Sequence, residues 1–272
     1  MAIEFCSLNS GSNGNCYYIG NKEAAILIDL GISCREVEKR MKSLDIPVEK
    51  VKAIFVSHEH SDHIRGIPVF CKKHNVPLYI TQATRKHAKM FFKHPYIFSF
   101  EEDVPVTIGN LTVTAFRKFH DAADPYSFTV EYKGIRIGVF TDIGRCCEKL
   151  ISNFRNCNAA FLESNYDEEM LANGSYPYYL KSRITGGLGH LSNREALELF
   201  LNHRSVELKH LILSHLSQEN NRPELVEHLF KQHANGTEVV VASRYAPTSV
   251  FRIEVPQTQE AGFLNQEFEN IL

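Results

Sequence analysis

The segment SHEHSDH, at residues 57–63, concentrates three histidines and two acids in seven positions. It continues the apolar run VKAIFV, which is typical of a buried strand. A strand that ends at Ser57 would carry four candidate ligands into the following loop: His58, His60, Asp62 and His63. Imidazole and carboxylate groups that converge on one point are typical of a metal site. A solvated polar loop would explain a lone His-x-His pair, but the longer His-x-His-x-Asp-His pattern favours metal binding.

Three further candidate ligands stand where later apolar runs end. His120 closes LTVTAFRKFH, Asp142 closes IRIGVFTD and His215 closes HLILSH. Side chains at the ends of several strands can meet at one edge of a sheet assembly. Seven nitrogen and oxygen ligands exceed the capacity of one tetrahedral site, so the pattern predicts two metal ions.

Two other segments could contact a phosphate-containing substrate. The turn-rich segment SGSNGN at 10–15, with Ser12, Asn13 and Asn15, favours either a backbone cradle for phosphate or a hairpin turn, and both interpretations stay open. Lys181 and Arg183 alternate with tyrosines near residues 176–183, as in contacts to single-stranded nucleic acid. A surface loop that only covers apolar core is the alternative for this second segment.

The elements that would position these residues alternate between strand and helix. Strands are predicted at 24–31, 51–57, 76–81, 158–164, 209–215 and 237–243, with antiparallel ribbons across 100–142. Helices are predicted at 34–46, up to Asn75, at 83–94 before Pro95, at 192–203 and at 222–233. The helix at 83–94 would place Arg85, Lys86, Lys89 and Lys93 on a phosphate-binding or simply solvated face. Residues 166–190 are predicted to be irregular, as in a lid or binding loop.

The whole-chain properties agree with one ordinary globular domain spanning residues 1–272, with 256–272 as a C-terminal extension. The 272 residues carry a formal charge of −2 and are 43% hydrophobic, so no global basic field indicates nucleic acid. No leader pattern and no run near the ~20 apolar residues of a membrane span is present, which favours a cytoplasmic protein without a membrane partner. The seven cysteines form no Cys-x-x-Cys motif, so reduced thiols are expected.

HEHSDH with the downstream His120, Asp142 and His215 resembles the metallo-β-lactamase superfamily. The resemblance implies a four-layer αβ/βα sandwich with a dinuclear site between its two sheets. It implies that His58, His60 and His120 bind one metal, that Asp62, His63 and His215 bind the other, and that Asp142 bridges them. A hydroxide shared by the two metals would then attack the substrate. The absence of a Cys ligand favours phosphoester over lactam chemistry, and the ligands suit Zn²⁺, Mn²⁺ or Fe²⁺.

Within this superfamily the chain resembles the YycJ/WalJ-like branch of single-domain, metal-dependent DNA exonucleases. The resemblance rests on LNSGSNGNCYYIG, FTDIG, ESN, YPYYLKSRI and GGLGHLSN, which follow one another in that order. It implies DNA as the substrate. One position departs from the branch pattern: Tyr166 stands where the branch usually has His.

Two residues are candidates for catalysis. Asp62 could orient the attacking hydroxide in addition to binding a metal. His190, in GGLGHLSN, precedes a helix that Ser192 or Asn193 would cap, with Glu195 in its first turn. An imidazole there could contact the scissile phosphate or donate a proton to the leaving 3′ oxygen, or else only hydrogen-bond the loop.

Alternative functions remain open at this stage. A small-molecule phosphodiesterase of the same fold is the first alternative, followed by a thioester or lactam hydrolase and by a metal-binding regulator without turnover. The chain has no room for the extra nucleic-acid clamp domain of RNase J-type proteins and no long arm of the RNase Z type. RNA processing is therefore less favoured than DNA cleavage, and a homo-oligomer is left open.

Overall fold

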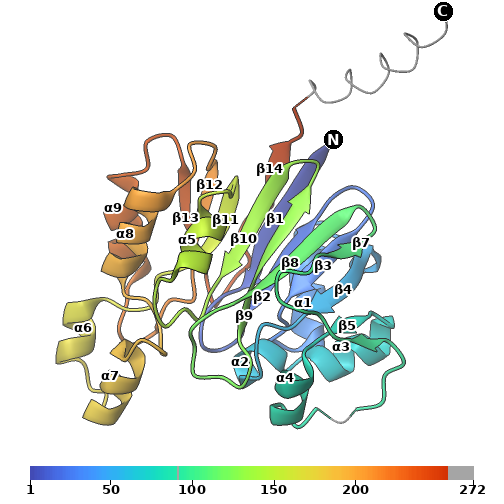
Figure 1. Ribbon diagram of the computed structural model, residues 1–272, viewed down its shortest axis with the longest axis horizontal. Helices are drawn as coiled ribbons and strands as arrows, with labels where there is room; N and C mark the ends of the chain where they lie inside the picture. Colours follow the sequence, from blue (N-terminus) through green and yellow to red (C-terminus); the bar gives the residue numbers. More distant parts are fainter. Residues whose placement is uncertain (91, 257–272) are drawn as a thin grey trace, which may run out of the picture.

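The computed structural model of the protein describes residues 1–90 and 92–256. Two seven-stranded sheets face each other, and helices cover the outer face of each sheet (Figure 1). This arrangement confirms the predicted four-layer αβ/βα sandwich. All but the first residue of the extension expected at 256–272 lies outside the described residues. Within the described part, no helix is both long and apolar enough to cross a membrane.

The first sheet is built mainly from the N-terminal half of the chain, with the last described strand added at its edge. Its order is β14-β1-β2-β3-β4-β5-β6, antiparallel from β14 to β3 and parallel from β3 to β6. The strands are β1 (Ala2–Asn9), β2 (Cys16–Gly20), β3 (Ala25–Ile28), β4 (Val51–Phe55), β5 (Leu78–Tyr79), β6 (Ile97–Phe98) and β14 (Phe251–Glu254).

The second sheet mirrors this organisation. Its order is β13-β12-β11-β10-β9-β8-β7, parallel from β13 to β10 and antiparallel from β10 to β7. The strands are β7 (Val106–Ile108), β8 (Leu111–Arg117), β9 (Tyr126–Tyr132), β10 (Ile135–Phe140), β11 (Ala159–Glu163), β12 (His210–Ser214) and β13 (Glu238–Val241).

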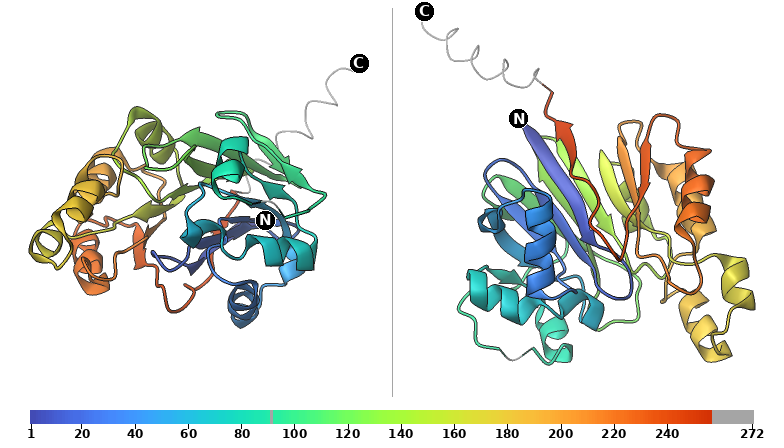
Figure 2. Two further views of the ribbon diagram at one scale, coloured as in Figure 1. Left: turned by 90° about the horizontal axis from the view of Figure 1, so that it is seen from below. Right: turned by 180° about the vertical axis from the view of Figure 1, so that it is seen from behind.

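The helices flank the sheets and also project beyond one end of them. The described helices are α1 (Cys34–Ser43), η1 (Val48–Lys50), α2 (Ser61–Ile64), α3 (Ile67–His74), α4 (Gln82–His87), α5 (Glu148–Phe154), α6 (Glu168–Asn173), α7 (Tyr178–Thr185), α8 (Asn193–His203) and α9 (Pro223–Lys231). Views from two sides show α6 and α7 on one side of the lower end and α2, α3 and α4 on the other (Figures 1 and 2).

Three buried apolar layers hold the sandwich together. The central layer lies between the sheets and includes Phe5, Phe55, Phe128 and Phe161. A second layer lies between the first sheet and its helices, and a third lies between the second sheet and α5, α8 and α9. Strands such as β3 and β11 are apolar along their whole length because both of their faces are covered.

The helix predicted at 83–94 is shorter than expected. It starts one residue earlier, where the Thr81 hydroxyl accepts the Thr84 N–H as an N-cap, and it ends at His87. Lys89 then adopts a left-handed backbone with φ 50°. The chain leaves the helix here, and Met90 packs into the layer outside the first sheet.

The prediction that residues 166–190 are irregular is wrong, because this segment contains α6 and α7. Asp167 caps α6 by accepting the Met170 N–H, and Pro177 precedes the first turn of α7. Leu171 and Ile184 pack with Tyr166 in a small separate cluster beneath the two helices. Helices of six and eight residues are too short to show a clear helical period in the sequence.

Candidate metal centre

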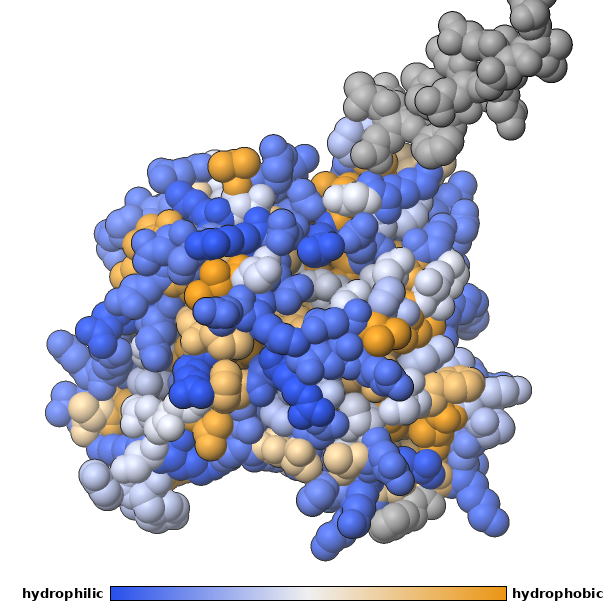
Figure 3. Space-filling view, viewed as in Figure 1, coloured by the Kyte–Doolittle hydropathy of each residue, from blue (hydrophilic) through white to orange (hydrophobic). Residues whose placement is uncertain are grey.

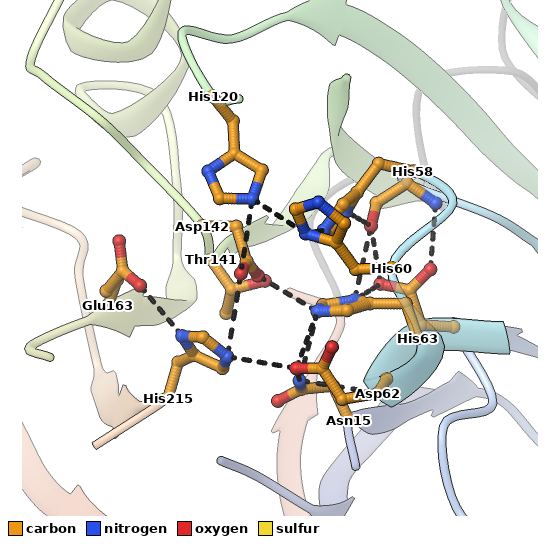
Figure 4. A network of polar contacts seen from close by, with 12 residues as sticks. Asn15, His58, His60, Asp62, His63, His120, Thr141, Asp142, Glu163 and His215 are labelled. Carbon is orange, nitrogen blue, oxygen red and sulfur yellow. Dashed lines mark hydrogen bonds and ion pairs between the residues drawn. The ribbon is translucent and has the colours of Figure 1, made fainter. Parts of the chain in front are cut away.

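The first group of candidate ligands consists of three imidazoles, His58, His60 and His120. His58 Nε2 lies 3.0 Å from His60 Nδ1, and His60 Nδ1 lies 3.2 Å from His120 Nε2. The three nitrogens face one another closely enough to bind a single cation. Two of these residues come from the loop after β4 and the third comes from the loop after β8 (Figure 4).

The second group consists of Asp62, His63 and His215. Asp62 Oδ2 lies 3.4 Å from His63 Nε2 and 3.6 Å from His215 Nε2. These donor atoms also lie within reach of one cation. Again the two sheets contribute together, because His63 belongs to α2 after β4 and His215 directly follows β12.

Asp142 lies between the two groups. Its Oδ2 is 3.2 Å from His63 Nε2, while its Oδ1 is 3.5 Å from His215 Nε2 and 3.8 Å from His120 Nε2. Asp142 Oδ2 and His215 Nε2 are buried and have no hydrogen-bond partner in the described structure. Buried polar atoms are rarely left without a partner, so these atoms and the converging donors around them fit bound cations.

Left-handed backbone conformations help to bring the site together. Asp29, Asp142 and His215 have φ of 59°, 56° and 58°, and they follow the ends of β3, β10 and β12. Such conformations are costly for residues other than glycine and cluster at functional sites. A Cβ on Gly31 would meet the Asp62 carbonyl oxygen at 1.6 Å, so only glycine permits this close approach to the Asp62 backbone.

Each ligand histidine except His60 has a partner for its Nδ1 atom. His63 Nδ1 donates to Asp29 Oδ2 at 2.7 Å, and His120 Nδ1 donates to the Gly189 carbonyl at 3.0 Å. The Ser57 hydroxyl donates to Asp29 Oδ2 and lies 2.8 Å from His58 Nδ1. These bonds fix the tautomer that leaves Nε2 free for a metal.

Glu163 is a fully buried carboxylate at the end of β11 that serves two histidines. Its Oε1 accepts from His215 Nδ1 at 2.8 Å and from His190 Nδ1 at 2.9 Å. Its Oε2 accepts the backbone N–H groups of Ile143 and Leu191 at 2.7 and 3.2 Å. The carboxylate therefore links the ligand His215 to His190, which is outside the two ligand groups.

The electrostatics of the site favour ionised carboxylates. Burial opposes the charge of Asp142, but His215 and His63 hold its pKa well below the usual range. Burial likewise opposes the charge of Glu163, but His190 and His215 lower its pKa to about 2. Burial is also the main reason why the pKa of His120 falls to about 3. Anionic carboxylates and neutral imidazoles are the forms that bind metals.

A polar cavity of about 330 Å³ opens onto this cluster. Its lining includes the donor residues His60, Asp62, Asp142 and His215, together with His190. The wall also includes residues of α2, α7 and the loops beside them: Ser12, Ser61, Asn165, Tyr176, Leu180, Arg183, Ile184 and Ser217. The metal cluster thus lies at the base of a cavity that a substrate can reach.

Only some of the residues predicted to bind substrate line the cavity. Ser12 and Arg183 line the cavity, and Arg183 forms an ion pair with Asp121 beside it. Asn15 is instead buried, and its amide donates to Asp62 Oδ2 at 3.2 Å, so it supports a candidate ligand. The segment 10–15 is a hairpin connection between β1 and β2, and the N–H groups of Gly11 and Gly14 are used inside it.

Two other predicted substrate contacts lie outside the cavity wall. The Asn13 amide donates to the Arg244 carbonyl at 3.4 Å, and Lys181 Nζ donates to the Ala172 carbonyl at 2.7 Å. Lys181 instead lines a separate hollow between α6, α7 and α8. The cations and aromatic residues along 176–183 could not show from the sequence that Lys181 and Arg183 are separated, because a helix places neighbouring residues on different faces.

Sequence reasoning missed the buried residues that hold the candidate ligands. Asp29 and Glu163 each follow or end a buried strand, which is the same signal that identified Asp142. Lys118 was also missed: its ammonium is buried and donates to the Thr141 carbonyl at 2.7 Å, next to Asp142. Burial lowers the pKa of Lys118, and the nearby carboxylates, Asp142 foremost, oppose that effect.

Residues 25–216 match the family described as the β-lactamase superfamily domain. The chain is 34% identical over 228 residues to exodeoxyribonuclease YycJ of Bacillus anthracis, covering 83% of this chain and 86% of that protein. It is 32% identical over 234 residues to exodeoxyribonuclease WalJ of Streptococcus pneumoniae, with the same coverage of 83% and 86%.

The fold is also similar to a solved structure, the metallo-β-lactamase fold protein YhfI of Bacillus subtilis. The TM-score is 0.72 with 18% sequence identity, and the match covers 93% of this chain and 99% of YhfI. At this level of identity the likeness concerns the fold alone.

Proposed function

The chain belongs to the β-lactamase superfamily and, within it, to the group of its YycJ and WalJ relatives, and on that premise we propose that it is a metal-dependent DNA exonuclease. The observation that carries this proposal is the cluster of seven converging donor residues at the base of a polar cavity. DNA is the proposed substrate because both named relatives are exodeoxyribonucleases.

We assign His58, His60 and His120 to one cation, Asp62, His63 and His215 to the other, and Asp142 to the position between them. These residues would hold two cations, whose chemistry would be to lower the pKa of water near neutral pH and to offset the charge of the phosphate. Nitrogen and oxygen ligands without a thiolate fit Zn²⁺, Mn²⁺ and Fe²⁺, which are the ions that we propose for the site.

The residues around the ligands supply orientation and proton transfer. Asp62 orients the attacking water, while the Asn15 amide at 3.2 Å holds the Asp62 carboxylate in place. His190 protonates the leaving 3′ oxygen through Nε2, because its Nδ1 is bound to Glu163 at 2.9 Å. Arg183 and Ser12 line the cavity where the phosphate of the terminal nucleotide binds. A buried, acceptor-only Glu163 keeps the Nδ1 proton on His190 and thus fixes its orientation.

We place this activity in the cytoplasm. All seven cysteines are free, and four of them belong to the layer outside the first sheet. Reduced cysteines are typical of the cytosol, where disulfides are rare.

The test compares substrates in parallel on protein reconstituted with Mn²⁺ or Zn²⁺. End-labelled single- and double-stranded DNA, RNA, a cyclic nucleotide and a thioester are incubated with the protein and with Asp142→Ala. We expect stepwise shortening of DNA from an end, lost in Asp142→Ala together with bound metal measured by elemental analysis. Cleavage of the cyclic nucleotide without any cleavage of DNA would refute the proposal.

A further inference from the structure

A second groove lies beside the metal centre, on the side away from α7. It has a volume of about 530 Å³ and is lined by polar and apolar residues of the loop after β4, of α2 and α3, and of the end of α4 and the segment that follows it. Ser61 lines both this groove and the metal cavity, so the two hollows adjoin. In the ribbon views α7, which walls the metal cavity, lies on one side of the lower end, and α2 and α4 lie on the other (Figures 1 and 2). We call this second groove the α2–α4 groove.

The α2–α4 groove carries two cationic side chains that are not paired with an acid in the described structure. Arg65 and Lys89 line it and are exposed, and neither forms an ion pair within the part of the chain that the structure describes. His87 adds a third basic side chain to the lining. In Figure 3 hydrophilic residues protrude at the bottom right, over the position of α4 in Figure 1, and a hydrophobic patch lies beside them.

One acid, Glu59, lines the described groove, and it faces inward. Its Oε1 accepts the Ala123 N–H at 2.8 Å, and its Oε2 is buried without a partner. The carboxylate reduces the positive potential of the groove, but its oxygens do not pair with Arg65 or Lys89. Both cations are therefore left available to an anionic ligand.

The backbone holds Lys89 at the groove. Lys89 follows Ala88, the C-cap residue of α4, and has a left-handed φ of 50°. Met90, the next residue, is buried in the layer outside the first sheet and anchors this turn. A non-glycine residue in this conformation is maintained only where its surroundings impose it.

We propose that the α2–α4 groove binds the sugar-phosphate backbone of the DNA strand beyond the scissile bond, with Arg65 and Lys89 contacting its phosphates. The inference rests on the proposed exonuclease function and extends it to the part of the substrate that is not cleaved. The metal cavity of about 330 Å³ receives the terminal nucleotide, and the rest of the strand passes over Ser61 into the groove. Phosphate contacts of this kind recognise the backbone and not the base sequence.

The test removes both cations in Arg65→Ala/Lys89→Ala. The control is Lys42→Ala/Lys72→Ala, which removes two exposed lysines that lie outside the groove lining and are equally without an ion pair in the described structure. Each protein is assayed on a 20-nucleotide single strand and on a dinucleotide, which is too short to reach the groove. We expect the ratio of kcat/KM for the long strand to that for the dinucleotide to fall about 10-fold in the groove variant. For the groove variant, the slope of the logarithm of the binding constant against the logarithm of the salt concentration should be less steep by about 1.4, since two single-strand phosphate contacts are lost.

Binding provides a readout that does not depend on cleavage. Fluorescence anisotropy with a phosphorothioate 20-mer should show weaker binding by the groove variant and unchanged binding by the control. If the wild-type protein cleaves no DNA, the proposed function fails, and the anisotropy comparison decides separately whether the groove holds a strand. An unchanged substrate ratio and unchanged binding in Arg65→Ala/Lys89→Ala, or an equal loss in both double variants, would overturn the proposal.

Discussion

At the scale of single residues, two buried carboxylates, Asp29 and Glu163, bind the candidate metal ligands in different ways. Asp29 binds one ligand histidine, His63, at 2.7 Å and also accepts the backbone N–H of Ser57. Glu163 binds His215 and His190 through the same oxygen. Asp29 therefore orients a candidate metal ligand only, whereas Glu163 orients both the candidate ligand His215 and the cavity residue His190.

Asp29→Asn should weaken metal binding by about 10- to 100-fold, the usual effect of removing a carboxylate behind a ligand histidine. The reason is that the neutral amide no longer raises the basicity of His63 or fixes its ring as firmly. Competition with a chelating dye measures the metal Kd. Asp45→Asn is a matched control, because Asp45 is exposed and shares the left-handed backbone of Asp29, with φ of 54° and 59°. Equal metal Kd values for the two variants would remove Asp29 from the support of the site.

His190→Ala should reduce kcat on DNA by about 10²-fold, the scale of a lost general acid. A p-nitrophenyl phosphodiester should be affected much less, because its leaving group departs without a proton. His190→Gln, which can keep a bond to Glu163, should show the same difference between substrates. Metal content by elemental analysis serves as the control and should stay normal. An equal loss on both substrates would assign His190 a structural role.

At the scale of elements, α1 and α3 are joined by one acid. Glu38 of α1 lies 2.7 Å from Lys73 Nζ and 2.7 Å from His74 Nε2 at the end of α3. Hydrogen bonds from Lys73 and His74 lower the pKa of Glu38 to about 2. The ionised carboxylate of Glu38 therefore stabilises the contact between α1 and α3 on the outer face of the first sheet.

Glu38→Gln should lower the Tm at neutral pH by about 2–4 °C, as for a loss of about 1 kcal/mol in a partly exposed ion pair. The folded pKa is depressed, so the stabilisation is complete above the ordinary carboxyl pKa of about 4.5 and is lost as the pH falls toward 2. The Tm difference between wild type and variant should shrink over that window. Scanning calorimetry at several pH values, with the exposed Glu49→Gln as control, makes the comparison. A pH-independent difference would show that the charge of Glu38 is not its cause.

At the scale of the whole molecule, the candidate ligands come from both sheets. The loop after β4 in the first sheet supplies His58, His60, Asp62 and His63, and the second sheet supplies the residues after β8, β10 and β12. Each proposed cation therefore cross-links the two halves of the sandwich. Without bound cations, the negative charge of Asp142 and Asp62 is balanced by the surrounding imidazoles and by the buried Lys118 ammonium.

Metal removal should lower the global stability and not only the activity. At a free metal concentration of 100 times Kd, binding contributes about 2.7 kcal/mol, which corresponds to roughly 5–10 °C in Tm. Thermal unfolding is followed with chelator and during titration with Mn²⁺ or Zn²⁺. Asp142→Ala should respond to added metal much less than the wild type. Identical melting curves with and without chelator would contradict a metal bound between the sheets.

The resemblance to the metallo-β-lactamase superfamily implied the sandwich fold, whereas the sequence itself determined the alternating elements and the positions of the seven candidate ligands. These features are local or periodic: each candidate ligand follows an apolar strand, and the pattern at residues 57–63 is contiguous. The end of α3, with Asn75 as its C-cap, was readable for the same reason, and so was the N-cap of α8, which the sequence narrowed to Ser192 or Asn193 and which the structure assigns to Ser192.

The tertiary structure alone decided which distant groups meet. Nothing near Asp29 in the sequence shows that it binds His63, 34 positions later, or that one Glu163 oxygen serves both His190 and His215. It also separated Arg183 at the cavity from Lys181 outside it, and it ended α4 at His87, three residues before the buried Met90. The physical reason is that partners of buried charges, and the choice between burial and continued helix, depend on contacts between segments far apart in the chain.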